Sequence, residues 1–220
     1  MIVWFVVLLA LAPSFILFVY VAKVKRSVWF TFGLGCLGWV VAFYARLPIL
    51  TGISRVAELN ILIIFALYAL FAGVFEEGLR YGLIRKVEKI RIDWKHVLSF
   101  GLGWGFIEAV LVYAVNILAT VYVLGMEIAF LDMLAGAVER NFTVIFHVAM
   151  TFIVCWAVKA KKLELFVVAI LIHTIVDFTV VVLYHIIKLP LWYVETSIFG
   201  IAILTLIFAW ILKKRLPTNF

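Results

Sequence analysis

Long apolar runs, separated by short charged or Pro/Gly-containing breaks, divide the chain from end to end. A helix of about 20 residues crosses the hydrocarbon of a bilayer. The runs therefore predict seven membrane-spanning helices, over residues 2–22, 28–46, 57–85, 96–118, 137–158, 163–187 and 191–212. The stretch 119–136 fits either an extension of its neighbours or an interfacial segment. Pro13 falls inside the first span, whereas Pro48 and Pro190 are expected in loops.

The composition agrees with this pattern. The 220 residues are 68% hydrophobic and 14% charged, whereas a soluble domain carries about 25% charged residues. The spans leave no length for a separate soluble domain. We expect an all-α, polytopic transmembrane bundle that forms one integral membrane domain over residues 1–220, with the lipid bilayer as its solvent.

The basic residues predict how the bundle is oriented. Fourteen of them follow the first, third, fifth and seventh spans: Lys23, Lys25, Arg26, Arg85, Lys86, Lys89, Arg91, Lys95, Lys159, Lys161, Lys162, Lys213, Lys214 and Arg215. The loops on the other side hold Arg46, Arg55 and Lys188. Cytoplasmic loops are enriched in Lys and Arg, so the N-terminus is predicted outside and the C-terminus inside. The net charge of +7 is then a signal of topology, and we expect no nucleic-acid partner.

Two adjacent carboxylates, Glu76 and Glu77, lie within the third apolar run, and Arg80 follows them. One charged side chain at the centre of a membrane helix costs about 2.5–3.5 kcal/mol on insertion scales. Such a pair is therefore expected to face the bundle interior. Arg80 shares a helix face with both carboxylates and is predicted to form an ion pair with Glu77.

Further ionisable residues are predicted at the same depth. At about 1.5 Å per residue, six of them lie about 12–22 Å from the cytoplasmic face. They come from four helices: Glu76, Glu77, Glu108, His147, His173 and Asp177. We expect this layer to form one site.

Local spacing adds detail to the layer. His173 and Asp177 are four residues apart, so Asp177 can orient the imidazole or lie beside it. Gly101 and Gly105 lie on the same side of their helix as Glu108 and predict close packing there. Glu139 and Arg140 are placed near the outer boundary, as a structural or interfacial pair.

Carboxylates and imidazoles without a nucleophilic Ser or Cys indicate activation of water. A carboxylate can act as general base while an imidazole stabilises the oxyanion of acyl transfer. The same groups could instead hold zinc, with Glu76, Glu108, His147 and His173 as candidate ligands. The residues alone leave both mechanisms open. They also leave open an ion or proton carrier, and a non-catalytic membrane scaffold or immunity-type protein.

The ordered motifs resemble a known group. Glu76-Glu77-x-x-Arg80, Phe106-x-Glu108, His147 and His173-x-x-x-Asp177 are similar to the superfamily of CAAX-prenyl endopeptidases and bacteriocin-processing membrane proteins, to which PrsW-type proteases are related. Within it, the segment Gly103–Ala109 and the stretch from Glu139 to His147 look like those of YhfC-like membrane peptidases. The resemblance covers about residues 65–185. The prenyl-endopeptidase pattern differs, with His at the position of Glu108 and usually Asn at that of Asp177.

This resemblance implies an intramembrane or membrane-surface endopeptidase of a prokaryotic cell membrane, with its cavity toward the cytoplasm. Its substrate would be a membrane protein or a lipid-anchored peptide. By analogy Glu76 would be the base that activates water, and His173 with Asp177 would stabilise the oxyanion. Glu108 and His147 would help to hold water or metal, and Glu77 and Arg80 would support the site.

Overall fold

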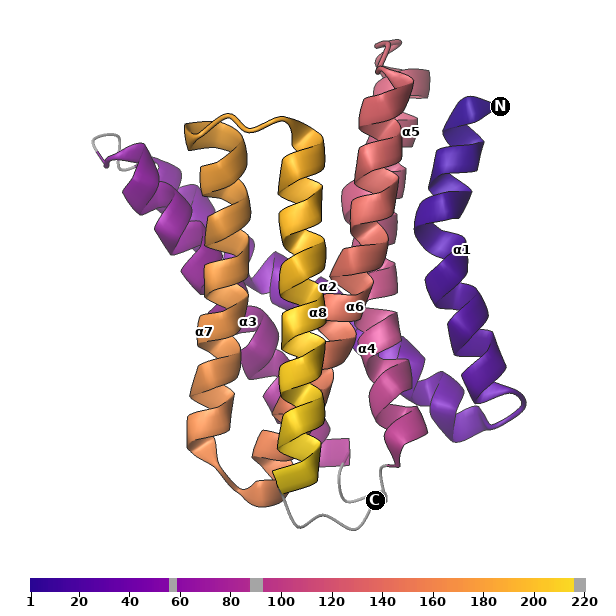
Figure 1. The fold of residues 1–220 in the computed structure, drawn as a ribbon, viewed down its shortest axis with the longest axis vertical. Helices are drawn as coiled ribbons and strands as arrows, with labels where there is room; N and C mark the ends of the chain where they lie inside the picture. Colours follow the sequence, from indigo (N-terminus) through magenta and orange to yellow (C-terminus); the bar gives the residue numbers. More distant parts are fainter. Residues whose placement is uncertain (56–58, 88–92, 216–220) are drawn as a thin grey trace.

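Figure 1 shows the fold in a computed structural model, which describes residues 1–55, 59–87 and 93–215. Within these residues the chain is helical throughout its regular structure, and seven helices are long and apolar enough to cross a membrane. The predicted all-α bundle with seven spans is therefore confirmed.

The first three spans are single helices, α1 (Ile2–Ala22), α2 (Arg26–Arg55) and α3 (Ile61–Val87). The fourth is continuous but changes its winding, through α4 (Trp94–Glu108), η2 (Ala109–Ala114), α5 (Val115–Leu118) and η3 (Ala119–Val123). The last three are α6 (Phe130–Ala160), α7 (Leu163–Val181) with η4 (Val182–Ile186), and α8 (Leu191–Arg215). The ambiguous stretch 119–136 thus extends both of its neighbours.

One predicted boundary is wrong in a way that matters for the site. The second span continues to Arg55, and Pro48 lies inside the helix rather than in a loop. Membrane helices tolerate proline because neighbouring groups satisfy the freed backbone. As a result Arg46, expected in a loop, lies within the helix and can reach the bundle interior.

The winding changes at a candidate site residue. Glu108 is the last residue of α4, and the π-helical η2 begins directly after it. The Asn116 amide donates to the carbonyls of Leu111 and Val112 at 3.2 and 2.8 Å, which satisfies acceptors of this segment. π-helical turns inside α-helices are frequent at functional sites.

Helix α6 is the most buried span and packs against α1, α3, α4, α7 and α8. Its contact with α4 depends on two glycines. A Cβ added at Gly101 would lie 2.8 Å from the Cα of Val148, and one at Gly105 would lie 2.8 Å from the Cα of Val144. The close approach predicted from these glycines is therefore present, and it sets Glu108 of α4 beside His147 of α6.

The ends of the bundle differ in charge. The turns between α1 and α2 and between α6 and α7 lie at the bottom of Figure 1, and we call this the basic end because it carries Lys23, Lys25, Lys161 and Lys162. The N-terminus and the connections 124–129 and 187–190 lie at the top, which we call the opposite end. Lys89 and Arg91, which also entered the topology prediction, are outside the described residues.

Candidate active site

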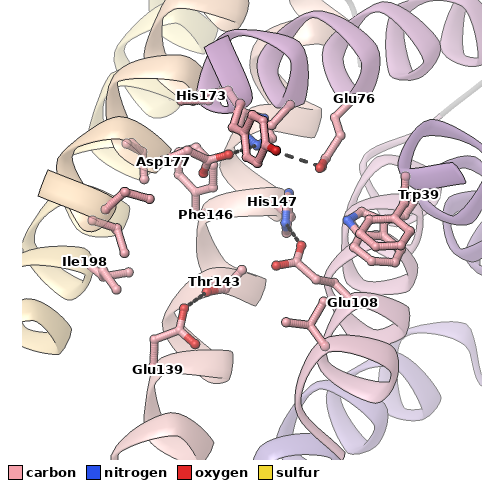
Figure 2. A pocket seen from close by; sticks show the side chains of 18 of the residues that line it. Trp39, Glu76, Glu108, Glu139, Thr143, Phe146, His147, His173, Asp177 and Ile198 are labelled. Atoms are coloured by element: carbon pink, nitrogen blue, oxygen red, sulfur yellow. Dashed lines mark hydrogen bonds and ion pairs between the residues drawn. The ribbon is translucent and has the colours of Figure 1, made fainter. Parts of the chain in front are cut away.

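A cavity of about 390 Å³ lies inside the bundle. Side chains from α2, α3, α6, α7 and α8 line it together with residues of the fourth span. The five residues predicted to be catalytic all line this cavity: Glu76, Glu108, His147, His173 and Asp177. Figure 2 shows these side chains turned toward a shared space from four different helices.

Glu77 and Arg80 lie beneath the cavity, and both side chains are 0% exposed. The Arg80 Nη1 donates to the two carboxylate oxygens of Glu77 at 2.5 and 2.6 Å. The guanidinium also covers the ring of Trp104, with Cζ 4.4 Å from its centroid. The ion pair predicted from sequence is therefore present, and it belongs to the packed interior.

His173 is oriented by Glu77. Its Nδ1 lies 2.6 Å from Glu77 Oε1, and a carboxylate paired with arginine can only accept a hydrogen bond, so Nδ1 carries a proton. The Nε2 atom then faces the cavity, 3.8 Å from Glu76 Oε2 and 3.7 Å from Asp177 Oδ2. Of the two placements considered for Asp177, orienting the ring or lying beside it, the structure has the second: its Oδ2 lies beside Nε2, beyond hydrogen-bonding distance.

Glu76 is held by two residues that the sequence analysis did not assign to the site. Arg46 Nη1 donates to its Oε1 at 2.8 Å, and Trp104 Nε1 donates to its Oε2 at 3.0 Å. Arg46 had been placed in a loop because Pro48 follows it, and no role had been assigned to Trp104. Trp104 is one helical turn before Glu108, a spacing that indicates a shared face.

Glu108 is held in a similar way. Arg140 Nη1 donates to its Oε1 at 3.0 Å, and its Oε2 lies 2.5 Å from His147 Nε2. Arg140 also contacts Glu139, whose other oxygen accepts from the Thr143 hydroxyl at 2.5 Å. Glu139 and Arg140 do form a pair, but they line the cavity rather than the outer boundary. Arg140 lies two turns before His147 on α6, and this spacing was the available signal.

The distances would allow a metal ion. One ligand atom each from Glu76, Glu108 and His147 lies within 4.8 Å of the others. Two carboxylates and an imidazole resemble the three-ligand sets of catalytic zinc, which leave one position for water.

The contacts of His147 do not suit this role. Its Nδ1 accepts from Arg80 Nη2 at 3.1 Å, so the proton of a neutral ring is on Nε2, the nitrogen that faces Glu108. A metal-binding histidine normally donates its other N–H to an acceptor, which a guanidinium cannot be. His173 does show this pattern, because its Nδ1 faces Glu77 and its Nε2 faces two carboxylates. By its hydrogen bonds His173 is therefore the better ligand, although it is the ligand atom of His147 that lies within 4.8 Å of both Glu76 and Glu108.

A second cavity of about 220 Å³ adjoins the first. The two share Glu139, Arg140, Val180, Val181 and Ile198. The second cavity continues along the ends of α7 and α8 that flank the 187–190 connection, where Tyr184, His185 and Leu191 line it. The cavities thus extend toward the opposite end of the bundle, which differs from the cytoplasm-facing cavity that the resemblance implies.

The comparison with protein families agrees with the motifs. The model of the family described as YhfC intramembrane metalloprotease matches residues 5–129 and 125–198. No curated protein matches the chain. The family match covers most of the sequence and includes every residue of the layer, so this membrane protein belongs to the YhfC intramembrane metalloprotease family.

Proposed function

We propose that this protein is an intramembrane endopeptidase that hydrolyses peptide bonds of a membrane-associated protein with activated water. One observation carries the proposal: acids and imidazoles from four helices meet in a cavity of about 390 Å³ within the membrane-spanning bundle. Membership of a family described as intramembrane metalloproteases supports it. We further propose that it works in a prokaryotic cell membrane.

Glu76 is the proposed general base. Arg46 and Trp104 fix its carboxylate, and its Oε2 faces His173 Nε2 across 3.8 Å. That separation is too long for a direct hydrogen bond and can be bridged by a water molecule. A water held there would pass a proton to Glu76 as its oxygen attacks the peptide carbonyl.

His173 is the proposed stabiliser of the oxyanion that this attack creates. Its Nδ1–H is held by Glu77, so a second proton on Nε2 would point into the cavity and donate to the oxyanion. Glu77 is itself fixed by Arg80. Asp177, 3.7 Å from Nε2, favours the positively charged ring.

Glu108 and His147 are proposed to form the second wall of the site and to position the water or the peptide. Their direct contact and the Arg140 bond fix both side chains. If zinc or another divalent ion is the cofactor, the donors that fit it are His173 Nε2 together with the carboxylates that face it. When bound, such an ion polarises the carbonyl and lowers the pKa of its water.

The geometry of the site favours a peptide hydrolase over an ion carrier. A carrier needs polar groups that continue toward both faces. Here the layer rests on buried apolar residues toward the basic end, including Met150, Ile153 and Trp156, each 0% exposed.

The test compares peptide termini in membranes that contain the wild type, Glu76→Gln or His173→Asn. Mass spectrometry of new N-termini should find a set of cleavages that requires the wild type and is lost in both variants. Size-exclusion chromatography of the purified variants checks that they fold. Identical termini in all three samples, with folded protein present, would reject the proposal.

A further inference from the structure

We infer that the catalytic cavity opens at the opposite end of the bundle, away from the cytoplasm. The substrates would then be membrane proteins with an apolar segment in the outer half of the bilayer or just outside it. The statement about substrates rests on the proposed function. The direction of the opening rests on geometry and charge alone.

On helices of both orientations, the residues that line the cavity extend in the same direction from the polar layer. Helices α3 and α6 run toward the basic end, and their described lining residues stop at Glu76 and His147. The fourth span and α7 run back, and their described lining residues begin at Glu108 and His173. On all four helices the cavity therefore starts at the polar layer and extends only toward the opposite end.

The space below the layer is filled. Arg80, Trp104, Met150, Ile153 and Trp156 lie on the basic side of the layer, and each is 0% exposed. A peptide could not reach Glu76 from the basic end without displacing this core. Cores packed to crystal-like density do not open for a chain without a large cost.

The second cavity supplies the continuation to the surface. It shares Val180, Val181 and Ile198 with the first, and it reaches Tyr184 and His185. Those two residues are exposed and precede the 187–190 connection. The two cavities thus trace a path from the polar layer to the end of the bundle.

The charges identify which compartment that end faces. Fourteen Lys and Arg residues flank the basic end along the sequence. Arg46 is bound to Glu76 inside the bundle. Of the three basic residues counted at the opposite end from sequence, Arg55 at the end of α2 and Lys188 remain there. The excess of Lys and Arg at the basic end is therefore larger than the count from sequence indicated. It assigns the opposite end to the non-cytoplasmic side.

The walls indicate the chemistry of the substrate. Above the polar layer most of the first cavity is lined by apolar and aromatic side chains, among them Phe43, Leu50, Tyr68, Val112 and Val180, while Glu139, Arg140 and Thr143 of α6 line one wall. Mostly apolar walls with a few polar groups bind an apolar segment and fix its orientation. An extended apolar stretch of a membrane-anchored protein fits this shape.

Thiol labelling tests the direction without any need for activity. Val180→Cys places a thiol where both cavities meet. Lys161→Cys and Lys188→Cys mark the basic and opposite ends, and both lysines are exposed loop residues with positive φ. The wild type, with Cys36 and Cys155, gives the background. A membrane-impermeant maleimide is applied to intact cells and to inside-out vesicles.

We expect Val180→Cys and Lys188→Cys to label in intact cells, and Lys161→Cys to label only in inside-out vesicles. Labelling of Val180→Cys from the vesicle side alone, or from neither side, would overturn the inference, as would labelling of Lys161→Cys in intact cells. The same pattern is expected in a Glu76→Gln background. A protein without protease activity can therefore still pass this test, and an active protease can fail it.

Discussion

The two halves of the bundle differ in how their interiors are filled. Toward the basic end, α6 is buried almost continuously from Phe146 to Val158 against α4, α7 and α8. Toward the opposite end, the same helix carries Glu139, Arg140 and Thr143 into open cavities. The polar layer lies at the boundary between them. One small bundle thus fills one half of its interior with packed side chains and leaves cavities in the other.

The largest effect on stability is expected in the filled half. Arg80→Met removes the partner of Glu77 and leaves a carboxylate buried without its cation. Breaking a buried ion pair in this way costs about 3–5 kcal/mol. Thermal unfolding in detergent should show a large drop in Tm, and Arg80→Lys a smaller one because it keeps the charge. An unchanged Tm for Arg80→Met would mean that the packed half does not depend on this pair.

Metal binding tests the boundary layer. If the protein uses a metal, a zinc titration followed by calorimetry should show that the wild type binds one ion. Loss of an outer-shell partner lowers metal affinity about 10–100-fold, so Glu77→Gln should weaken binding by that amount. His173→Asn should weaken it more, and His147→Asn less than His173→Asn.

The reverse order of the two histidine variants would place the ion on Glu76, Glu108 and His147 instead. A wild type that takes up no divalent metal would leave the attack on the peptide to the carboxylate and water alone.

The close contact between α4 and α6 gives a third test. Gly105→Leu inserts a side chain where even a Cβ would lie 2.8 Å from the Cα of Val144. Overpacking of this kind costs about 1–3 kcal/mol, and it should also separate Glu108 from His147. Gly82→Ala is the control, since nothing lies within 4 Å of a Cβ added there. Equal Tm values for the two variants would contradict the close packing described between α4 and α6.

The smallest effect on stability is expected in the open half. Val180→Phe fills space where the two cavities meet, and we expect its free energy of unfolding to stay within about 0.5 kcal/mol of the wild type. Cleavage should nevertheless fall, because the substrate path is blocked. Val167→Phe is the matched control on α7, at an exposed position outside the cavity lining. Equal cleavage by both variants would show that the path does not carry substrate.

Local sequence rules were sufficient for much of this architecture. The length of the apolar runs predicted the spans, and the i, i+3 spacing predicted the Glu77–Arg80 pair. Gly101 and Gly105 predicted the approach of α4 to α6. Counting residues from the basic end of each helix predicted that ionisable side chains of four helices lie at one depth. The count works because the rise per residue in a membrane helix varies little.

Partners from other helices were harder to predict. Arg46 and Arg140 hold the two carboxylates of the layer, but their assignment depends on helix ends and on rotation between helices. Proline is a weak boundary signal in a membrane helix, and this misplaced Arg46. The direction of the cavity depends on which half of the bundle is densely packed, a property that no single span encodes.

The central claim is that Glu76 and His173 hydrolyse a peptide bond in this cavity. The most direct measurement is the cleavage rate of purified protein in lipid nanodiscs, using a substrate identified from the wild-type-dependent termini. Glu76→Gln should lower the rate about 10²–10⁴-fold, the range for loss of a general base, while Tm shows that the variant is folded. Cleavage by folded Glu76→Gln at the wild-type rate would contradict the claim.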